Sequence, residues 1–252
     1  MNNTLAPTMP AEIRSMPVTF GNVTYVLDYP HSIVMESALR EVLEEKAYPY
    51  LEFMVDRPGV IIDVGGNVGA ASLAFSLRYP GKDIYTFEPS RSIFPFLRQN
   101  AERLPSTRAF NVGLYDRDCT TRLYTGTRAS VTSSISGSSL NGSDYEMIEL
   151  RRASTILEEN KVDRIAILKI DTEGAEVPIL RDIEHLLDRV DVIFLEYHSE
   201  ADRVEIDHLL NGRFALFNGT VELHRGNLGY VAKDVIAEMT AFDQAQIARP
   251  TF

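Results

Sequence analysis

Short apolar runs alternate with amphipathic stretches along most of this chain, which predicts an α/β fold. Residues 60–64 and 165–170 are almost wholly apolar and rich in β-branched side chains, as buried parallel strands are. Between such runs, apolar residues recur every three or four positions, which is typical of helices that cover a sheet. We therefore expect one large domain built on a doubly wound, mostly parallel sheet of seven strands. The expected strands are residues 60–64, 83–89, 107–114, 165–170, 192–197, 214–218 and 229–235, and the expected helices are 68–78, 92–103 and 179–187.

The N-terminal part predicts an extension that packs on this domain. Residues 1–17 contain several prolines and no clear periodicity, so we expect them to be flexible. Residues 18–29 place a Gly-Asn turn between two β-rich runs, which predicts a hairpin. Residues 32–46 carry the apolar stripe of an amphipathic helix. The expected organisation is a flexible segment 1–17, a hairpin and helix 18–57, the main domain 58–240 and a C-terminal tail 241–252.

Residues 125–144 differ in composition from the rest of the chain. Ten of these 20 residues are Ser or Thr and three are Gly. A flexible surface loop is one interpretation, and a mobile flap over the active site is the other, with hydroxyls available to a polar substrate. Residues 145–151 then return as a strand, and Thr155 with Glu158 forms a capping box that predicts the start of a short helix.

A glycine loop with the spacing Asp63-x-Gly65-x-Asn67-x-Gly69 follows the first expected strand. Its glycines let the backbone turn sharply and approach a ligand closely, while the next helix aims free N–H groups at that ligand. Glu88 lies 19 residues after Gly69, at the end of the second expected strand. A carboxylate there can accept both ribose hydroxyls of a nucleoside. The pattern therefore predicts a nucleoside-binding βαβ unit.

The nucleoside could be S-adenosylmethionine or a nicotinamide dinucleotide, and a purely structural loop is the third alternative. The dinucleotide fingerprint is G-x-G-x-x-G, and the glycines here do not fall in that register. A pyrophosphate would be repelled by Asp63, whereas the sulfonium and ammonium of S-adenosylmethionine would be attracted to it. The helix N-terminus can accept the methionine carboxylate. The sequence favours S-adenosylmethionine.

Composition narrows the class of partner. The net charge is −11 and the isoelectric point about 5.0, which argues against a nucleic-acid substrate, because such binding needs a basic stripe. Cys119 is the single cysteine, so an intrachain disulfide is impossible and a reducing compartment is expected. No apolar run approaches the ~20 residues that cross a bilayer, and no signal peptide is evident. We expect a soluble cytoplasmic protein; its oligomeric state is open, with a homodimer as one alternative.

Further polar residues follow the fourth and fifth expected parallel strands. Asp171 ends the strand 165–170, and Glu196 and His198 end the strand 192–197. Ligands of open α/β sheets bind beyond the carboxyl ends of the strands. Carboxylates beside an apolar sheet cost desolvation energy unless they are paired or used, so packing alone does not explain them.

These motifs resemble the FkbM family of methyltransferases. The resemblance covers about residues 60–200 and rests on Asp63-Val-Gly-Gly-Asn-Val-Gly69, Phe87-Glu-Pro89, Leu168-Lys-Ile-Asp-Thr-Glu-Gly-Ala-Glu176 and Leu195-Glu-Tyr-His198. It implies a class I, Rossmann-like fold, S-adenosylmethionine as cofactor, and methylation of hydroxyl oxygens on sugars or secondary metabolites. Gly66 departs from the Ala that is usual in the family. By resemblance, the cofactor would be held by Asp63, Gly65, Asn67, Gly69 and Glu88, with Gly113 or Asp116 beside the adenine.

An alcohol oxygen is a poor nucleophile until its proton leaves, so a base is expected at the site. His198 and Asp171 are the candidates. The alternative for His198 is a ring bonded to a backbone carbonyl, and for Asp171 a structural partner of Lys169 or of backbone N–H groups. Glu173 is expected to cap the helix that follows it. A further hypothesis is a divalent cation such as Mg²⁺, held by Asp171, Glu196 and His198.

Taken together, the motifs predict an S-adenosylmethionine-dependent O-methyltransferase that acts on a small polar acceptor, such as a sugar, a glycan or a secondary metabolite. The alternatives are a non-catalytic module that binds a nucleoside or S-adenosylmethionine, and an NAD-dependent oxidoreductase. Methyl transfer is an in-line displacement, so the protein mainly has to position the two reactants.

Overall fold

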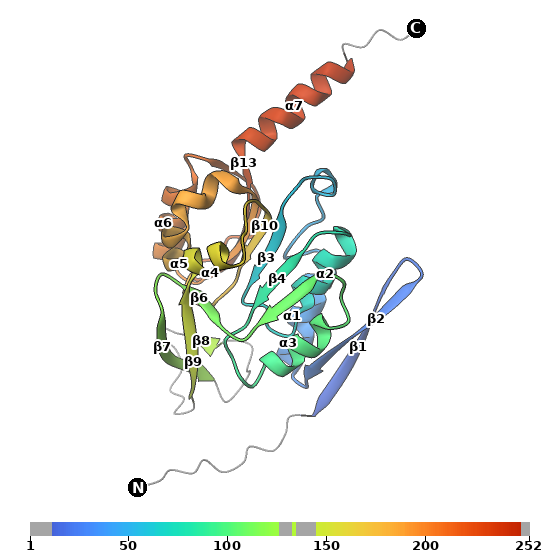
Figure 1. The fold of residues 1–252 in the computed structure, drawn as a ribbon, viewed down its shortest axis with the longest axis vertical. Coiled ribbons are helices and arrows are strands. Elements are labelled where there is room, and N and C mark those ends of the chain that lie inside the picture. Colours follow the sequence, from blue (N-terminus) through green and yellow to red (C-terminus); the bar gives the residue numbers. More distant parts are fainter. Residues whose placement is uncertain (1–11, 126–132, 135–144, 248–252) are drawn as a thin grey trace.

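A seven-stranded sheet forms the centre of the molecule (Figure 1). The computed structural model describes residues 12–125, 133–134 and 145–247. The strand order is β12-β13-β11-β10-β3-β4-β5; the last five are parallel, and β13 runs antiparallel to both of its neighbours. This confirms the doubly wound, mostly parallel sheet. The strands are β3 (Val60–Val64), β4 (Ile84–Phe87), β5 (Thr107–Phe110), β10 (Ile165–Ile170), β11 (Val190–Tyr197), β12 (Phe214–Gly219) and β13 (Gly226–Ala232).

Helices cover both faces of this sheet because its central strands are apolar on both sides. All residues of β10 and β11 are buried. The helices α1, α2 and α3 lie on one side of the sheet, and α4, α5 and α6 lie on the other (Figure 1). Their bounds are α1 (Ile33–Leu43), α2 (Ala70–Arg78), α3 (Phe94–Ala101), α4 (Ala153–Glu159), α5 (Glu176–Asp182) and α6 (Glu200–Leu210), with short 3-10 helices η1 (Glu52–Met54) and η2 (Glu184–Arg189).

The N-terminal extension contains the expected hairpin and helix, but the hairpin is longer than predicted. Its strands are β1 (Ile13–Phe20) and β2 (Val23–Pro30), and α1 follows, capped by the Ser32 side chain. Residues 13–17, expected to be flexible, therefore belong to β1. They are ordered by contacts that the local sequence does not show: Ser15 Oγ donates to Asp28 Oδ1 at 2.5 Å, and Met16 packs against a buried apolar cluster.

The expected strand 107–114 is divided between two sheets. β5 ends at Phe110, and β6 (Gly113–Tyr115) leaves the central sheet to pair with β9 (Tyr145–Arg152). With β7 (Cys119–Thr125) and β8 (Ser133–Ser134) they form a second sheet in the order β6-β9-β7-β8, which the sequence did not predict. The strand expected over 145–151 is confirmed as β9. Most of the hypothetical flap, 126–132 and 135–144, lies outside the described residues.

Two helix boundaries differ from the predictions. The capping box at Thr155 is wrong because α4 begins two residues earlier, where Asp182 of α5 accepts a hydrogen bond from Ser154 N at 2.7 Å. The expected strand 229–235 ends at Ala232, and α7 (Lys233–Ile247) follows directly, so much of the expected C-terminal tail is helical. α7 projects away from the rest of the molecule (Figure 1).

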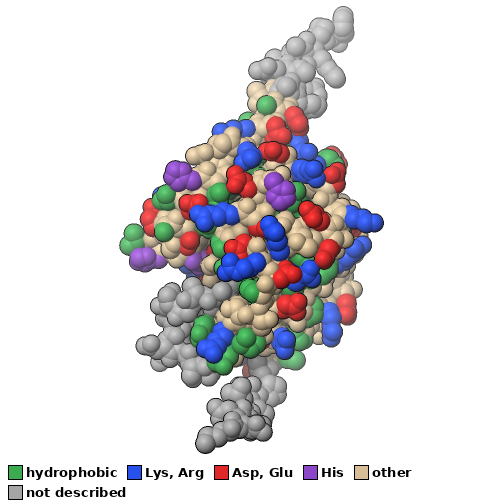
Figure 2. Space-filling view, turned by 60° about the vertical axis from the view of Figure 1, so that its left-hand side comes forward, with side chains coloured by type: hydrophobic (Ala, Val, Ile, Leu, Met, Phe, Trp, Pro, Cys, Tyr) green, Lys and Arg blue, Asp and Glu red, His purple; other side chains and the backbone are tan. Residues whose placement is uncertain are grey.

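The surface mixes charges of both signs. On the face shown in Figure 2, Lys and Arg side chains alternate with Asp and Glu side chains, and neither sign dominates a large area. Among the helices that the structure describes, none combines the length and the apolar composition of a membrane span.

Asn100 of α3 joins the extension to the glycine loop. Its Oδ1 accepts from Asp28 N at 3.0 Å, and its Nδ2 donates to Asp28 O at 2.8 Å and to Val68 O at 2.7 Å. All three bonds are buried, so each backbone group would lose its partner if this amide were removed. One side chain thus fixes β2 against the segment that leads into α2.

The substitution Asn100→Ala should lower the free energy of unfolding by about 2–4 kcal/mol, because three buried backbone groups lose a partner. Chemical denaturation would measure this loss. The matched control is Gln99→Ala, which removes one bond from an exposed side chain to Asp28 Oδ2 and should cost less than about 1 kcal/mol. Equal effects of the two substitutions would contradict the assigned role of Asn100.

Candidate functional site

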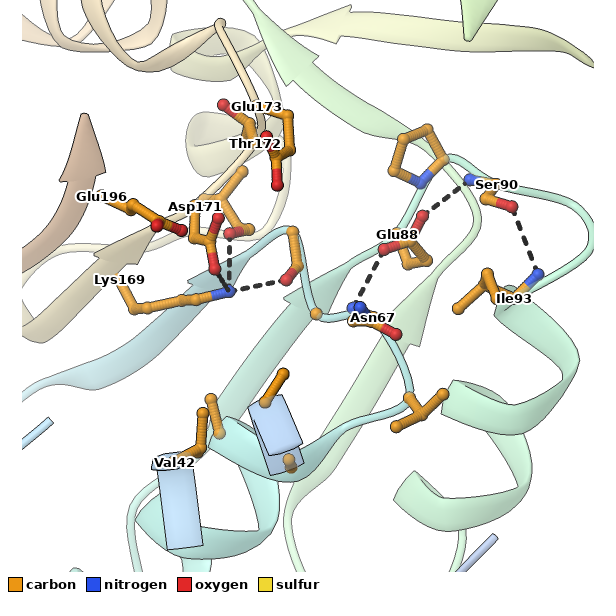
Figure 3. A pocket seen from close by; sticks show the side chains of 18 of the residues that line it. Val42, Asn67, Glu88, Ser90, Ile93, Lys169, Asp171, Thr172, Glu173 and Glu196 are labelled. Atoms are coloured by element: carbon orange, nitrogen blue, oxygen red, sulfur yellow. Dashed lines mark hydrogen bonds and ion pairs between the residues drawn. The ribbon is translucent and has the colours of Figure 1, made fainter. Parts of the chain in front are cut away.

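A cavity of about 350 Å³ opens at the carboxyl ends of β3, β4, β10 and β11. Glu88 and Asn67 lie on one side of it, and Lys169, Asp171 and Glu196 lie on the other (Figure 3). Helix α1 supplies a further wall, which includes Val42. The cavity therefore lies at the edge of the sheet that the sequence indicated.

The glycine loop packs directly on the chain that follows β10. Gly65 has a φ of +77°, and a Cβ atom there would lie 1.8 Å from Asp171 O. A Cβ atom on Gly66 would lie 2.1 Å from Thr86 Oγ1. The N–H groups of both glycines donate to Phe87 O, at 3.0 and 2.9 Å. Side chains at these positions would separate the loop from β4 and β10, so the glycines are required by close approach.

Glu88 is buried beside this loop and lines the cavity. Its Oε2 accepts from Asn67 N at 2.9 Å and its Oε1 accepts from Ser90 N at 2.8 Å. Burial raises the pKa of Glu88 to about 7, although the two N–H groups oppose the rise. Asn67 adopts a φ of +50°, the left-handed backbone that Asn tolerates. The loop and Glu88 are thus assembled as the sequence predicted.

Asp63 has a different place from the one expected. It is fully buried and is not among the residues that line the cavity. Its Oδ2 accepts from Ser72 Oγ at 2.6 Å, and its Oδ1 lies 3.1 Å from Lys169 Nζ. Asp63 is thus paired within the protein at the base of the loop, and its contact with a cofactor stays a prediction.

Lys169 is the partner that the sequence analysis did not assign to the site. Its Nζ donates to Val64 O at 3.1 Å and to Gly65 O at 2.6 Å. Burial would lower the pKa of Lys169, but the carboxylates of Asp63 and Asp171 outweigh burial and raise it. The ammonium thus stays charged and clamps the loop. A single lysine inside an otherwise apolar strand was the available signal.

The acidic residues after β10 and β11 meet at the other side of the cavity. One ligand atom from each of Asp171, Glu173, Glu196 and His198 lies within 4.8 Å of the others. Arg225, from the turn before β13, lies with its Nε 2.6 Å from Glu196 Oε1 and also lines the cavity. Burial, followed by the nearby Asp171 carboxylate, raises the pKa of Glu196 to about 8. Arg225 lies 29 residues from Glu196 in the chain, so no local motif predicts that it belongs to the site.

His198 sits behind this group, outside the cavity lining. Its Nε2 lies 3.1 Å from Glu173 Oε2, and its Nδ1 lies 3.4 Å from Glu176 Oε1. Burial alone would lower the pKa of His198, but the two glutamates outweigh burial and raise it to about 11. The ring is therefore an imidazolium at neutral pH, which cannot accept a proton. The role of base for His198 stays a prediction, which its pairing with Glu173 and Glu176 opposes.

Glu176, and not Glu173, satisfies the backbone at the start of α5. Glu176 Oε1 accepts from Thr172 N at 2.9 Å, and its Oε2 accepts from Gly174 N at 3.0 Å. Glu173, the residue expected to cap this helix, has a φ of +58° and points to His198 instead. The prediction for Glu173 is wrong because the turn at Gly174 places the later carboxylate over the free N–H groups.

The remaining predicted residues divide between the cavity and its surroundings. Gly113 lines the cavity, and a Cβ atom there would lie 2.5 Å from Leu150 Cδ2. Asp116 lies outside the lining, 3.3 Å from the Arg117 guanidinium. Gly69 also lies outside it, at the N-cap of α2 with a φ of +93°. Of the two candidates near the adenine, the structure brings only Gly113 to the cavity.

Glu146 of β9 connects the second sheet to Ser90, which lines the cavity. Its carboxylate accepts hydrogen bonds from Ser90 Oγ and, at 3.0 Å, from Arg91 N. Ser90 N in turn donates to Glu88. The second sheet therefore fixes the segment after β4 from outside the central sheet.

Comparisons with known proteins agree with this geometry. The model of the methyltransferase FkbM domain matches residues 63–231. "Methyltransferase 1" of Beauveria bassiana is 29% identical over 175 residues, covering 60% of this chain and 70% of that protein. Hexuronic acid methyltransferase AglP of Haloferax volcanii is 23% identical over 180 residues, covering 70% and 67%. 31-O-demethyl-FK506 methyltransferase FkbM of Streptomyces tacrolimicus is 41% identical over 66 residues, covering 25% of each chain.

The family match covers more than half of the chain and includes the glycine loop, Glu88 and the strand-end acids. It confirms the resemblance found in the motifs and the class I methyltransferase fold that the strand order displays. This chain belongs to the FkbM family of methyltransferases.

Proposed function

We propose that this enzyme transfers a methyl group from S-adenosylmethionine to a hydroxyl of a small polar acceptor, most simply a sugar or a glycan-linked group. The observation that carries the proposal is one cavity with two chemically different sides. A buried carboxylate, Glu88, lies beside the glycine loop on one side, and the acids after β10 and β11 lie on the other. The first side suits a nucleoside and the second suits an acceptor.

The residues of the first side fit the cofactor. Glu88 has the position from which a carboxylate accepts ribose hydroxyls, and the close-packed Gly65 and Gly66 leave the loop backbone free to approach a ligand. Gly113 packs closely on Leu150, and together with Leu114 they line the cavity with an apolar surface for a flat base. When bound, S-adenosylmethionine supplies a methyl group that is activated by a positively charged sulfur.

On the second side, Asp171 is the group that we assign as base. It lines the cavity, and its N–H donates to Val64 O at 3.1 Å, which fixes it beside the loop. The carboxylate can accept the proton of an acceptor hydroxyl, which makes the oxygen nucleophilic. His198 positions Glu173 by an ion pair and does not contact the cavity.

The names of two relatives support this class of acceptor. AglP is named for a hexuronic acid and the Streptomyces enzyme for methylation of an oxygen. Arg225, Thr172 and Glu173 give the second side groups that can hydrogen-bond a polyol. A nucleic-acid acceptor does not suit the acidic chain, and a cytoplasmic location suits its single cysteine.

A divalent cation is a further proposal at the second side. Asp171, Glu173 and Glu196 offer the oxygen ligands that Mg²⁺ prefers, and they converge beside the proposed base. His198 completes the set only if it gives up its proton and its pairing with Glu173 and Glu176. A cation here would polarise the acceptor hydroxyl.

Titration calorimetry with S-adenosylhomocysteine should show affinity that falls as the pH drops below about 7, approaching tenfold per pH unit, because the ribose-binding form of Glu88 is the carboxylate. The contribution of Glu88 to the free energy of unfolding should change in the opposite direction and fall as the pH rises. A carboxyl whose pKa is raised on folding stabilises the fold below its unfolded pKa, and this stability is lost as the pH rises through 7. In the variant Glu88→Gln, both the affinity for S-adenosylhomocysteine and the stability should lose these contributions to their dependence on pH. If both pH profiles were the same as in the parent, the role assigned to Glu88 would be refuted.

The variant Asp171→Asn should lose at least about 100-fold in kcat, measured as S-adenosylhomocysteine release with an acceptor identified from a panel of sugars and glycans, because the base is gone. Its affinity for S-adenosylhomocysteine should change less than about threefold. Asp116→Asn, the same change outside the cavity, should leave both quantities intact. A parent protein that binds the cofactor but methylates no acceptor would instead indicate a non-catalytic module. Selective binding of NAD would indicate an oxidoreductase.

Exhaustive chelation followed by gel filtration should abolish methyl transfer, and Mg²⁺ or Mn²⁺ should restore it, if the cation is required. Calorimetric titration of the chelated protein with Mn²⁺ should then show one site, lost in Glu196→Gln. Full activity after chelation would exclude the cation while leaving the proposed methyl transfer in place.

A further inference from the structure

Tyr48 reaches the cavity from outside the segment that the family model matches. It lies between α1 and η1, before residue 63, yet it lines the same cavity as Lys169 and Asp171. Only 3% of its surface is exposed. The N-terminal extension therefore contributes a polar side chain to the site.

The ring of Tyr48 is held in one place by packing. Its centroid lies 5.9 Å from that of Phe75 on α2 and 5.6 Å from that of Phe194 on β11. Its backbone carbonyl accepts a hydrogen bond from Arg78 Nη1 at 2.9 Å, and Arg78 is itself buried. With both ring and backbone fixed, the direction of the hydroxyl is fixed as well.

The hydroxyl of Tyr48 has no hydrogen bond within the described part of the chain, although buried phenols usually have a partner. The nearby charges are the carboxylates of Asp171, Asp63 and Glu196, at the ends of β10, β3 and β11, and then that of Glu41 on α1. Burial, reinforced by these carboxylates, raises the pKa of Tyr48 well above its ordinary value, so the phenol keeps its proton. It is a free hydrogen-bonding group at the acceptor side.

We propose that the Tyr48 hydroxyl binds the acceptor, at the oxygen that receives the methyl group. This inference rests on the proposed function. The acceptor oxygen gives its proton to Asp171 and accepts a hydrogen bond from Tyr48. Its remaining lone pair forms the new C–O bond, while the electrons of the breaking C–S bond stay on sulfur as a neutral thioether. Tyr48 thus fixes the direction of attack.

Sinefungin tests this role without knowledge of the acceptor, because a carbon replaces the sulfur of S-adenosylmethionine and an ammonium group on that carbon replaces the methyl group. Its ammonium therefore points toward the acceptor side, whereas S-adenosylhomocysteine has nothing there. We would measure the affinity of both compounds by calorimetry for the parent, Tyr48→Phe and Tyr79→Phe. Tyr79 is the matched control: its buried hydroxyl accepts from Leu51 N at 3.0 Å and does not line the cavity.

Tyr48→Phe should weaken sinefungin binding about tenfold, the effect of one hydrogen bond to a charged group, and change S-adenosylhomocysteine binding less than twofold. Tyr79→Phe should change both affinities less than twofold, even where it lowers the melting temperature. Once an acceptor is known, Tyr48→Phe should also lower kcat/KM about tenfold or more.

Two results would overturn the role of Tyr48. If both compounds lose affinity together in Tyr48→Phe, the hydroxyl binds the shared part of the cofactor. If neither loses affinity, the hydroxyl does not reach the point of transfer. A parent protein that binds neither compound would refute the proposed function itself, which is a separate outcome.

Discussion

The buried ion pair between Asp63 and Lys169 is the interaction on which the rest of the site depends. Lys169 lies inside β10 and places its ammonium against Asp63 and against two carbonyls of the glycine loop. Burying two charges is costly unless each also has hydrogen bonds, and here both do: Ser72 donates to Asp63, and the loop carbonyls accept from Lys169. The loop, β3 and β10 are therefore held as one unit. Glu88 and Asp171 take their places on either side of it.

Much of the central sheet and of the glycine loop could be predicted from the sequence because these features are local. The strands 60–64 and 165–170 have the predicted bounds, since short apolar runs rich in β-branched residues favour buried strands. The glycine loop and Glu88 could be predicted because each position in that spacing requires a particular backbone conformation or a charge.

The features that could not be predicted depend on contacts between distant segments. β6 belongs to the same expected strand, 107–114, as β5, and only its pairing with β9 removes it from the central sheet. Asp63 and Lys169 are 106 residues apart in the chain, so their pairing is not visible in either motif. His198 was a reasonable base by residue type, but two glutamates near it in space hold its proton.

The wall that α1 and Tyr48 give the cavity has an evolutionary consequence. It lies before the segment shared with the family, whereas the groups assigned to the methyl donor lie within that segment. Mutations in this wall can therefore change the shape of the cavity while the glycine loop and Glu88 are retained. A methyltransferase divided in this way can vary one wall of its cavity by diversifying a short N-terminal stretch, while the domain shared with its relatives is inherited unchanged.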